Sequence, residues 1–203
     1  MKKKDAAGTS SWHCEICQNN KKKQSEDIMK GDISHDIINK VFAPLKISCR
    51  GYRKKISILC KIHELVTFLI NDEFGRFFSE QIKISLYLKF IKDPKDLTTI
   101  AMNLINGTYL QDASSTLSRN DINVCDLNEN TFDEIILAVL NDIEKVWQNC
   151  FVFNEEGSAM YRIGKIMQEK YHTISERSFY NDLTPDIKLD LVEYIKERSK
   201  EQH

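Results

Sequence analysis

Two closely spaced cysteines near the amino terminus have the spacing of metal ligands. Cys14 and Cys17 are separated by two residues, and His13 directly precedes them. Two thiolates on one tight turn fill half of the tetrahedral coordination that zinc prefers, whereas a structural site needs four ligands. Cys49 and His35 are the other nearby candidates, and their spacing fits no zinc finger. The pair is therefore either part of a truncated site or two cysteines that bind no metal.

Two further segments combine polar and aromatic residues. One runs from Tyr87 to Leu97 and the other from Gln148 to Ser158, with Asn154 inside it. Taken alone, such an asparagine is most simply a helix cap or a turn residue. Tyr87 alone could equally be a core aromatic residue, and Met160 could be core at helical spacing.

Catalytic motifs are missing from the sequence. It contains no glycine-rich phosphate loop, no His-Glu-x-x-His pattern and no Gly-x-Ser-x-Gly turn. On the predicted helices, carboxylates alternate with lysines, as they do on solvated faces. We therefore expect a binding module and not an enzyme.

The elements that position these residues are expected to be mostly helical. The 203 residues are 41% hydrophobic and 29% charged. Only three prolines and seven glycines are present, which is few for the turns that a β-sheet protein needs between its strands. A chain of this length can form one large domain, or one ordinary domain with an appendage. No apolar stretch approaches the ~20 residues of a membrane span. The first lysines are not followed by the apolar run of a signal peptide.

Apolar residues recur every three to four positions in five segments, and each predicts a helix. The first three segments are residues 53–72, residues 96–104, which follow Asp93-Pro94, and residues 131–150, which begin with a Thr131-x-x-Glu134 capping box. The fourth segment carries Met160 to Tyr171. The last helix is capped by Thr184-Pro185 and has Leu189, Val192 and Ile195 on its apolar face. Residues 73–93 are expected to be a long connection, and 107–129 a polar insertion with at most one helical turn. A weak helix is expected near 33–43.

Charge and cysteine content divide the chain and indicate its compartment. Residues 1–55 contain 13 Lys/Arg against 6 Asp/Glu, whereas residues 56–203 contain 16 against 24. The basic leader is either a solvated linker or a surface for weak contact with nucleic acid. The six cysteines show no disulfide framework in a chain of this size, so a reducing compartment is expected.

Together, the two aromatic segments resemble the bromodomain family. Its hallmark is a tyrosine, then a proline and an aspartate opening the second helix, then an asparagine in the turn after the third helix. The order and spacing match over residues 53–175. The resemblance implies an all-α fold, a left-handed four-helix bundle. This chain would add an inserted loop between the second and third helices and an extra C-terminal helix.

The resemblance also implies an acetyl-lysine pocket at one end of the bundle. Asn154 falls at the pocket asparagine, Tyr87 at the tyrosine that holds a water, and Met160 at the pocket mouth. The implied apolar lining is Ile82, Ile84, Phe153 and Phe78. Acetylation turns a hydrated ammonium into a neutral amide, so its reader needs an apolar slot with one fixed donor, which an asparagine NH₂ supplies. Unmodified lysine would instead be desolvated with its charge unpaired.

The chain departs from the family at the entrance of its first loop. Many bromodomains have Trp-Pro-Phe there, whereas this chain has Arg76-Phe77-Phe78, and the connection from Phe78 to Tyr87 is shorter than usual. An arginine offers only its stem as an apolar wall. We therefore expect a pocket that is shallower on this side.

The segment Trp12 to Cys17 resembles the closing Trp-x-Cys-x-x-Cys of a PHD finger. The combined order is most like the PHD finger-bromodomain cassettes of tripartite-motif chromatin co-regulators. The expected organisation is a finger remnant at 1–20, a basic linker at 21–52, and a bromodomain with its helical extension at 53–203. Zinc is expected only if an upstream finger is complete, and no other cofactor is expected.

The predicted function is a nuclear module that binds acetylated histone peptides in chromatin regulation. Membrane partners are not expected, and the oligomeric state is left open. The alternative is a helical interaction scaffold with a vestigial pocket that binds DNA or a protein partner. Arg76 and the short loop favour this alternative, whereas Tyr87 and Asn154 favour the reader.

Overall fold

The computed structural model describes residues 50–113 and 129–200, and every regular element in these ranges is a helix. Four helices match the predicted bundle: α3 (Arg50–Asn71), α5 (Leu97–Ile105), α7 (Glu129–Phe153) and α8 (Ala159–Ser178). Shorter elements are η2 (Gly75–Phe77), α4 (Ser85–Phe90), α6 (Thr108–Ala113) and η4 (Tyr180–Asp182), and α9 (Pro185–Lys200) follows the bundle. The helical bundle predicted from the sequence is confirmed.

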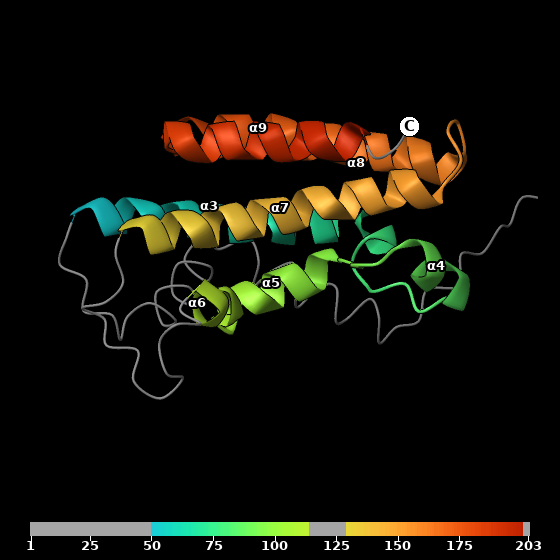
Figure 1. The fold of residues 1–203 in the computed structure, drawn as a ribbon, viewed down its shortest axis with the longest axis horizontal. Helices are drawn as coiled ribbons and strands as arrows, with labels where there is room; N and C mark the ends of the chain where they lie inside the picture. The colour runs from blue at the N-terminus through green and yellow to red at the C-terminus, as the bar shows by residue number, and fades with distance from the viewer. Residues whose placement is uncertain (1–49, 114–128, 201–203) are drawn as a thin grey trace, which may run out of the picture. The chain divides into compact units, whose positions relative to one another are not determined.

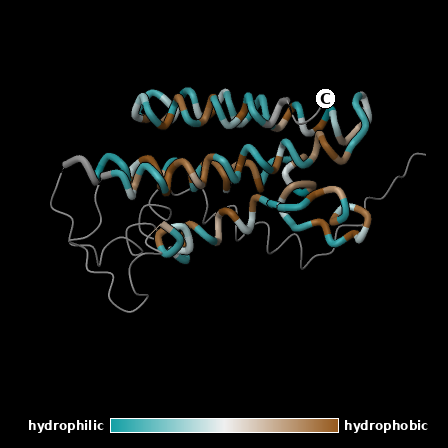
Figure 2. Tube along the Cα trace, viewed as in Figure 1, coloured by the Kyte–Doolittle hydropathy of each residue, from teal (hydrophilic) through white to brown (hydrophobic). Residues whose placement is uncertain are grey.

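Helix α7 forms the centre of the packing. It contacts α3, α5, α6, α8 and α9, and Figure 1 shows it between α9 on one side and α5 with α6 on the other. The largest fully buried side chains include Trp147, Phe132, Phe179, Leu59 and Ile62. Figure 2 shows apolar positions recurring along α3, α5 and α7, while α9 is mostly hydrophilic. The core therefore lies around α7.

Helix α5 begins slightly later than the sequence predicted. Its N-cap is Asp96, whose carboxylate accepts hydrogen bonds from the Thr99 backbone N–H at 2.8 Å and the Thr99 hydroxyl at 2.7 Å. Pro94 precedes this cap and is therefore not the first helical residue. The helix ends at Asn106, where Gly107 adopts φ 71°, a left-handed conformation that glycine tolerates best.

The capping box predicted at Thr131 is wrong. Helix α7 already begins at Glu129, so Thr131 lies inside its first turn. A Thr-x-x-Glu pattern favours a helix start, but the backbone continues the helix upstream and overrides that preference. The predicted cap at Thr184 is present, since its hydroxyl oxygen accepts from the Ile187 backbone N–H at 3.4 Å.

The apolar face predicted for the last helix also differs. Leu189 and Val192 are exposed, whereas Ile187 and Leu191 are buried and Ile195 packs against the core. Both sets have helical spacing, so the sequence pattern alone does not distinguish them. The docking of α9 onto α7 selects the Ile187–Leu191 face.

The two connections contain more structure than predicted. Residues 73–93 include η2 and α4, and the start of the 107–129 insertion forms α6. The predicted finger remnant with Cys14 and Cys17, the weak helix at 33–43, and residues 114–128 of the insertion lie outside the described residues. Among the helices that are described, none is long and apolar enough to cross a membrane.

Candidate functional site

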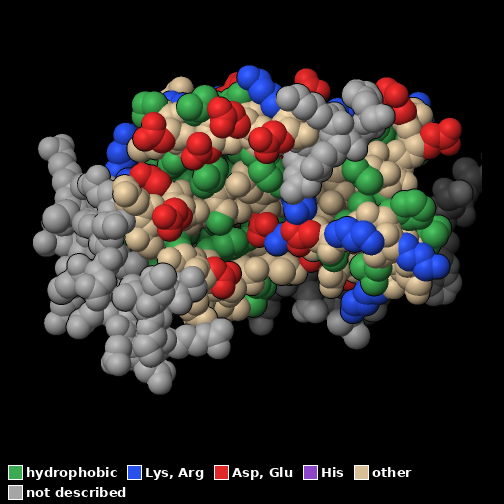
Figure 3. All heavy atoms as spheres, viewed as in Figure 1, with side chains coloured by type: hydrophobic (Ala, Val, Ile, Leu, Met, Phe, Trp, Pro, Cys, Tyr) green, Lys and Arg blue, Asp and Glu red, His purple; other side chains and the backbone are tan. Residues whose placement is uncertain are grey.

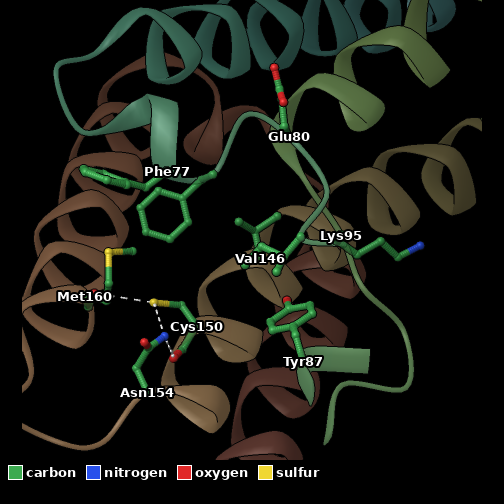
Figure 4. Close-up of a pocket in the computed structure, with 10 residues that line it drawn as sticks. Phe77, Glu80, Tyr87, Lys95, Val146, Cys150, Asn154 and Met160 are labelled. Carbon is green, nitrogen blue, oxygen red and sulfur yellow. Dashed lines mark hydrogen bonds between the residues drawn. The ribbon is translucent and has the colours of Figure 1, made fainter. Parts of the chain in front are cut away.

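A small cavity lies at the end of the bundle where α4, α7 and the start of α8 meet. Its volume is about 30 Å³, which is room for one or two water molecules. Its lining consists of Phe77, Phe78, Glu80, Ile82, Tyr87, Lys95, Val146, Cys150, Asn154 and Met160. In Figure 4, Lys95 extends away from the cavity, so its Nζ lies outside the apolar interior.

Three of these residues share one stripe of α7. Val146, Cys150 and Asn154 follow one another at intervals of four residues, which places them on one face of the helix. This spacing could have identified Val146 and Cys150 as pocket residues from the sequence. Burial raises the pKa of the Cys150 thiol to about 11, so it stays neutral and cannot act as a thiolate near neutral pH.

The amide of Asn154 is held in place by Cys150. Asn154 Nδ2 donates to the Cys150 carbonyl oxygen at 2.8 Å, and the Cys150 Sγ lies 3.6 Å from the same nitrogen. Both contacts are drawn in Figure 4. One N–H is thus satisfied by a strong acceptor, while the other has only sulfur, which is a weak one. A carbonyl oxygen inside the cavity would be a better partner for the second N–H.

Tyr87 reaches the cavity from α4. Its side chain is buried, and its ring meets the ring of Phe153 edge-on, with centroids 4.9 Å apart. Burial raises the pKa of Tyr87 to about 12, so the hydroxyl stays protonated and can both donate and accept. The hydroxyl is therefore suited to hold a water molecule or a ligand oxygen.

The segment that carries Tyr87 is fastened to α7 by polar contacts. Asn149 Nδ2 donates to the Asp93 carbonyl oxygen at 2.9 Å, and Lys145 Nζ lies 2.7 Å from the Asp93 carboxylate. Lys95 joins Asp93 to Asp142, at 3.5 Å and 2.9 Å. These contacts join the α4–α5 connection to α7.

Phenylalanines form the side wall of the cavity at the position where the sequence suggested the aliphatic stem of Arg76. Phe77 and Phe78 both line the cavity, and the guanidinium of Arg76 lies over the Phe77 ring, 4.9 Å from its centroid. Phe78 is buried and packs edge-on against Trp147 at 5.2 Å. The sequence placed Arg76 at this wall and predicted a shallower pocket on this side. In the structure the 3-10 turn η2 presents Phe77 to the cavity, and Arg76 does not line it.

Two glycines allow the close approaches that shape this end of the bundle. A Cβ at Gly75 would lie 2.0 Å from the Leu69 carbonyl oxygen, so only glycine fits the turn that leads into Phe77. A Cβ at Gly164 would lie 2.9 Å from Cys150 Sγ, so glycine lets α8 pack directly against the pocket stripe of α7.

Most of the predicted site residues meet at this cavity. Asn154, Tyr87, Met160, Ile82 and Phe78 all line it. Ile84 does not, because it is 59% exposed at the start of α4. Phe153 lies behind Tyr87 and supports its ring from outside the lining. No group of His, Cys, Asp or Glu side chains within the described ranges is arranged to hold a metal ion.

Comparison with known proteins decides the family. The model of the bromodomain family matches residues 62–166, which is 105 of the 203 residues. The chain belongs to the bromodomain family. The matched range includes every residue that lines the cavity. Bromodomains are acetyl-lysine-binding modules and not enzymes.

Two relatives illustrate the extent of the match. Bromodomain-containing factor 2 of Saccharomyces cerevisiae (strain ATCC 204508 / S288c) is 27% identical over 106 residues. This match covers 51% of the present chain and 13% of that protein's length. The structure of the bromodomain from human BAZ1A is 21% identical, covers 58% of this chain and 90% of that one, and has a TM-score of 0.41.

Proposed function

We propose that this chain binds acetyl-lysine through the cavity between Tyr87 and Asn154. The carrying observation is that a fixed amide donor and a neutral hydroxyl border the same apolar cavity. The N–H of Asn154 that contacts only the Cys150 sulfur would donate to the acetyl carbonyl oxygen, and the Tyr87 hydroxyl would reach the same oxygen through a water. Unmodified lysine would bring a desolvated cation to a donor, and is disfavoured for that reason.

Entry of the ligand requires movement at the rim of the cavity. The present volume of about 30 Å³ accommodates water but is too small for an acetylated side chain. Met160 has a flexible thioether side chain, and Phe77 is 37% exposed, so both can turn outward. The floor differs, because Phe78 is packed against the fully buried Trp147. We expect rotamer changes at the rim and little change below it.

The wider role that we infer is that of a nuclear, non-enzymatic reader of acetylated histone peptides in chromatin regulation. A PHD finger remnant at residues 1–20, with Cys14 and Cys17, and a basic linker at 21–52 with weak affinity for nucleic acid would complete a cassette of the tripartite-motif type. Family membership supports the acetyl-lysine part of this proposal, and the resemblance of Trp12 to Cys17 supports the rest.

The decisive experiment compares Asn154→Ala with the unaltered protein. Loss of the direct donor leaves the acetyl carbonyl underpaired, at a cost of about 1–3 kcal/mol. Because only a small side chain is buried, the initial affinity is expected on the order of 10–1,000 μM, and the variant should show no measurable binding. Calorimetry with acetylated and unmodified histone peptides measures both proteins.

Thermal denaturation provides the control, because Asn154 lies at the half-buried end of α7 and its removal should leave the melting temperature nearly unchanged. A folded Asn154→Ala protein with full affinity would contradict the assignment of the pocket. It would favour the alternative of a helical scaffold with a vestigial pocket that binds DNA or a protein partner.

A further inference from the structure

A second hollow lies on the described surface between α6, α7 and α9. We call it the acidic groove, and its volume is about 500 Å³. Its floor and walls include Ile135, Ala138, Tyr109 and Tyr194, and its edge includes Asp112 and Glu134. Apolar surface, tyrosine rings and carboxylates thus meet in a space much larger than the cavity at Asn154.

The lysines that line the groove are already neutralised. Lys95 Nζ lies 2.9 Å from the Asp142 carboxylate, and Lys145 Nζ lies 2.7 Å from the Asp93 carboxylate. The Tyr109 hydroxyl also donates to Asp142, at 2.8 Å. By contrast, Asp112 and Glu134 are exposed and form no ion pair with any residue that the structure describes. The remaining charge of the groove is therefore negative.

Helix α9 carries two carboxylates beside Tyr194, its residue in the groove lining. Asp190 and Glu197 lie four residues before and three residues after Tyr194, so they flank it on one face of the helix. Both are exposed, and neither has an ion-pair partner within the described part of the chain. Figure 3 shows acidic side chains on both sides of an apolar strip between α9 and α7. This combination favours a cationic partner with an apolar stem.

The groove and the acetyl-lysine cavity share one lining residue, Lys95, on the α4–α5 connection. Along α7, Asn141 in the groove and Asn154 in the cavity are 13 residues apart, or about 20 Å at 1.5 Å per residue. An extended peptide advances about 3.3–3.6 Å per residue, so roughly six residues cover this distance. A single peptide can therefore reach both.

We propose that the acidic groove binds lysine or arginine side chains located about four to eight residues from the acetylated lysine in the same ligand. The stems of these side chains would pack on Tyr109 and Tyr194, while their charges approach Asp112, Glu134, Asp190 and Glu197. This inference rests on the proposed function, since the acetylated lysine defines the register. It assigns to the chain a preference for acetyl-lysine within a basic sequence.

The test measures the affinity of the full chain for two acetylated peptides. They differ only at positions four to eight on both sides of the acetyl-lysine, which are arginine and lysine in one peptide and glutamine in the other. The groove variant is Asp112→Asn with Glu134→Gln. The matched control is Glu64→Gln with Glu169→Gln, which makes the same change in net charge at exposed sites on α3 and α8.

We expect the groove variant to bind the basic acetylated peptide three- to tenfold more weakly, and the control variant less than twofold more weakly. Neither variant should change the affinity for the glutamine peptide, and raised salt should remove most of the difference between the two peptides. Equal losses in the two variants, or no loss in the groove variant, would overturn the inference. An unacetylated basic peptide that bound as tightly as the acetylated one would also overturn it, because the groove would then serve a separate ligand.

Asn154→Ala separates this failure from failure of the proposed function. If the pocket reads acetyl-lysine, this substitution removes measurable binding of the glutamine peptide whatever the groove does. If the unaltered protein binds neither acetylated peptide, both proposals fall. If it binds both equally and Asn154→Ala removes both, only the groove inference falls.

Discussion

Two polar side chains, one buried inside α7 and one half-buried directly after its C-terminal end, have different partners. Glu144 is 1% exposed and meets two side chains of α8: its Oε1 lies 3.1 Å from His172 Nε2, and its Oε2 accepts from Gln168 Nε2 at 3.4 Å. Asn154 lies ten residues further along, about 15 Å on the helix, and borders a cavity. Among the described residues, its side-chain N–H groups contact only Cys150 in the preceding turn.

The difference shows how one helix can serve both stability and recognition. The carboxylate of Glu144 accepts from Gln168 and lies beside His172, so it joins α7 to α8. The second N–H of Asn154 has no strong acceptor among the described residues, so it remains available to a ligand. Substitutions at Glu144 should therefore change folding, and substitutions around Asn154 should change binding.

The largest expected effect on stability is that of Glu144→Ala. Removal of this buried carboxylate leaves Gln168 without its partner and creates a void beside Tyr171, at a cost of about 2–3 kcal/mol in the free energy of unfolding. Glu144→Gln, which keeps a carbonyl oxygen at the same place, should lose less. Urea denaturation measures both variants. A variant that stayed folded but lost acetyl-peptide binding would break the proposed separation of roles.

Phe77→Ala examines the pocket wall. Flat aromatic ligands that rely on a shelf at the pocket entrance should bind about tenfold more weakly, or about 1.4 kcal/mol, because the variant loses that wall. Arg76→Ala should bind them nearly as the unaltered protein does, since Arg76 only covers the outer side of the Phe77 ring. Competition binding compares the two variants. If Arg76→Ala lost more affinity for these ligands than Phe77→Ala, Arg76 and not Phe77 would form the wall.

Tyr87→Phe should have a graded effect on affinity. The phenol is proposed to act through a water, and a second water can replace part of that contact, so a loss of about 0.5–1.5 kcal/mol is expected. Because the ring still packs on Phe153, the melting temperature should stay nearly constant. Calorimetry on Tyr87→Phe and Asn154→Ala compares how much affinity each substitution loses. An equal or greater loss for Tyr87→Phe would indicate that the phenol contacts the ligand directly.

The smallest predicted effect is a pH dependence of stability from His172. Its contact with Glu144 raises the pKa of His172 above 6.5 in the folded state, with Glu176 also contributing. A raised folded pKa means that this stabilisation is complete below about pH 6 and is lost as pH rises through the folded pKa. The side chain is 43% exposed, so solvent screening limits the effect to below about 1 kcal/mol.

Denaturation of the unaltered protein and of His172→Gln at several pH values between 5.5 and 8.5 measures this effect. The difference between the two proteins should shrink as pH rises. A difference that grew with pH would contradict the assignment of the charge pair, and acetyl-peptide binding should not follow the same profile.

Local sequence patterns determined much of the fold and of the site. The three- to four-residue spacing of apolar residues located α3 and α7 to within three residues at each end, because burying one stripe of a helix requires that period. It also placed Met160 to Tyr171 on one helix, α8, which continues to Ser178. Tyr87-to-Leu97 and Gln148-to-Ser158 identified the family, and placed Tyr87, Asn154, Met160, Ile82 and Phe78, which do line one cavity. These assignments depend on residues close together in sequence.

Tertiary packing decided the rest. Both apolar stripes of α9 have helical spacing, and only docking on α7 buries Ile187 and Leu191 while leaving Leu189 exposed. The turn at Gly75 leads into Phe77 in the cavity wall, whereas Ile84 at the start of α4 is exposed outside it. The acidic groove combines side chains from α6, α7 and α9, which lie far apart in the chain. Sequence periodicity specifies which faces are apolar, whereas only the contacts between helices determine which face is covered and which remains open to a ligand.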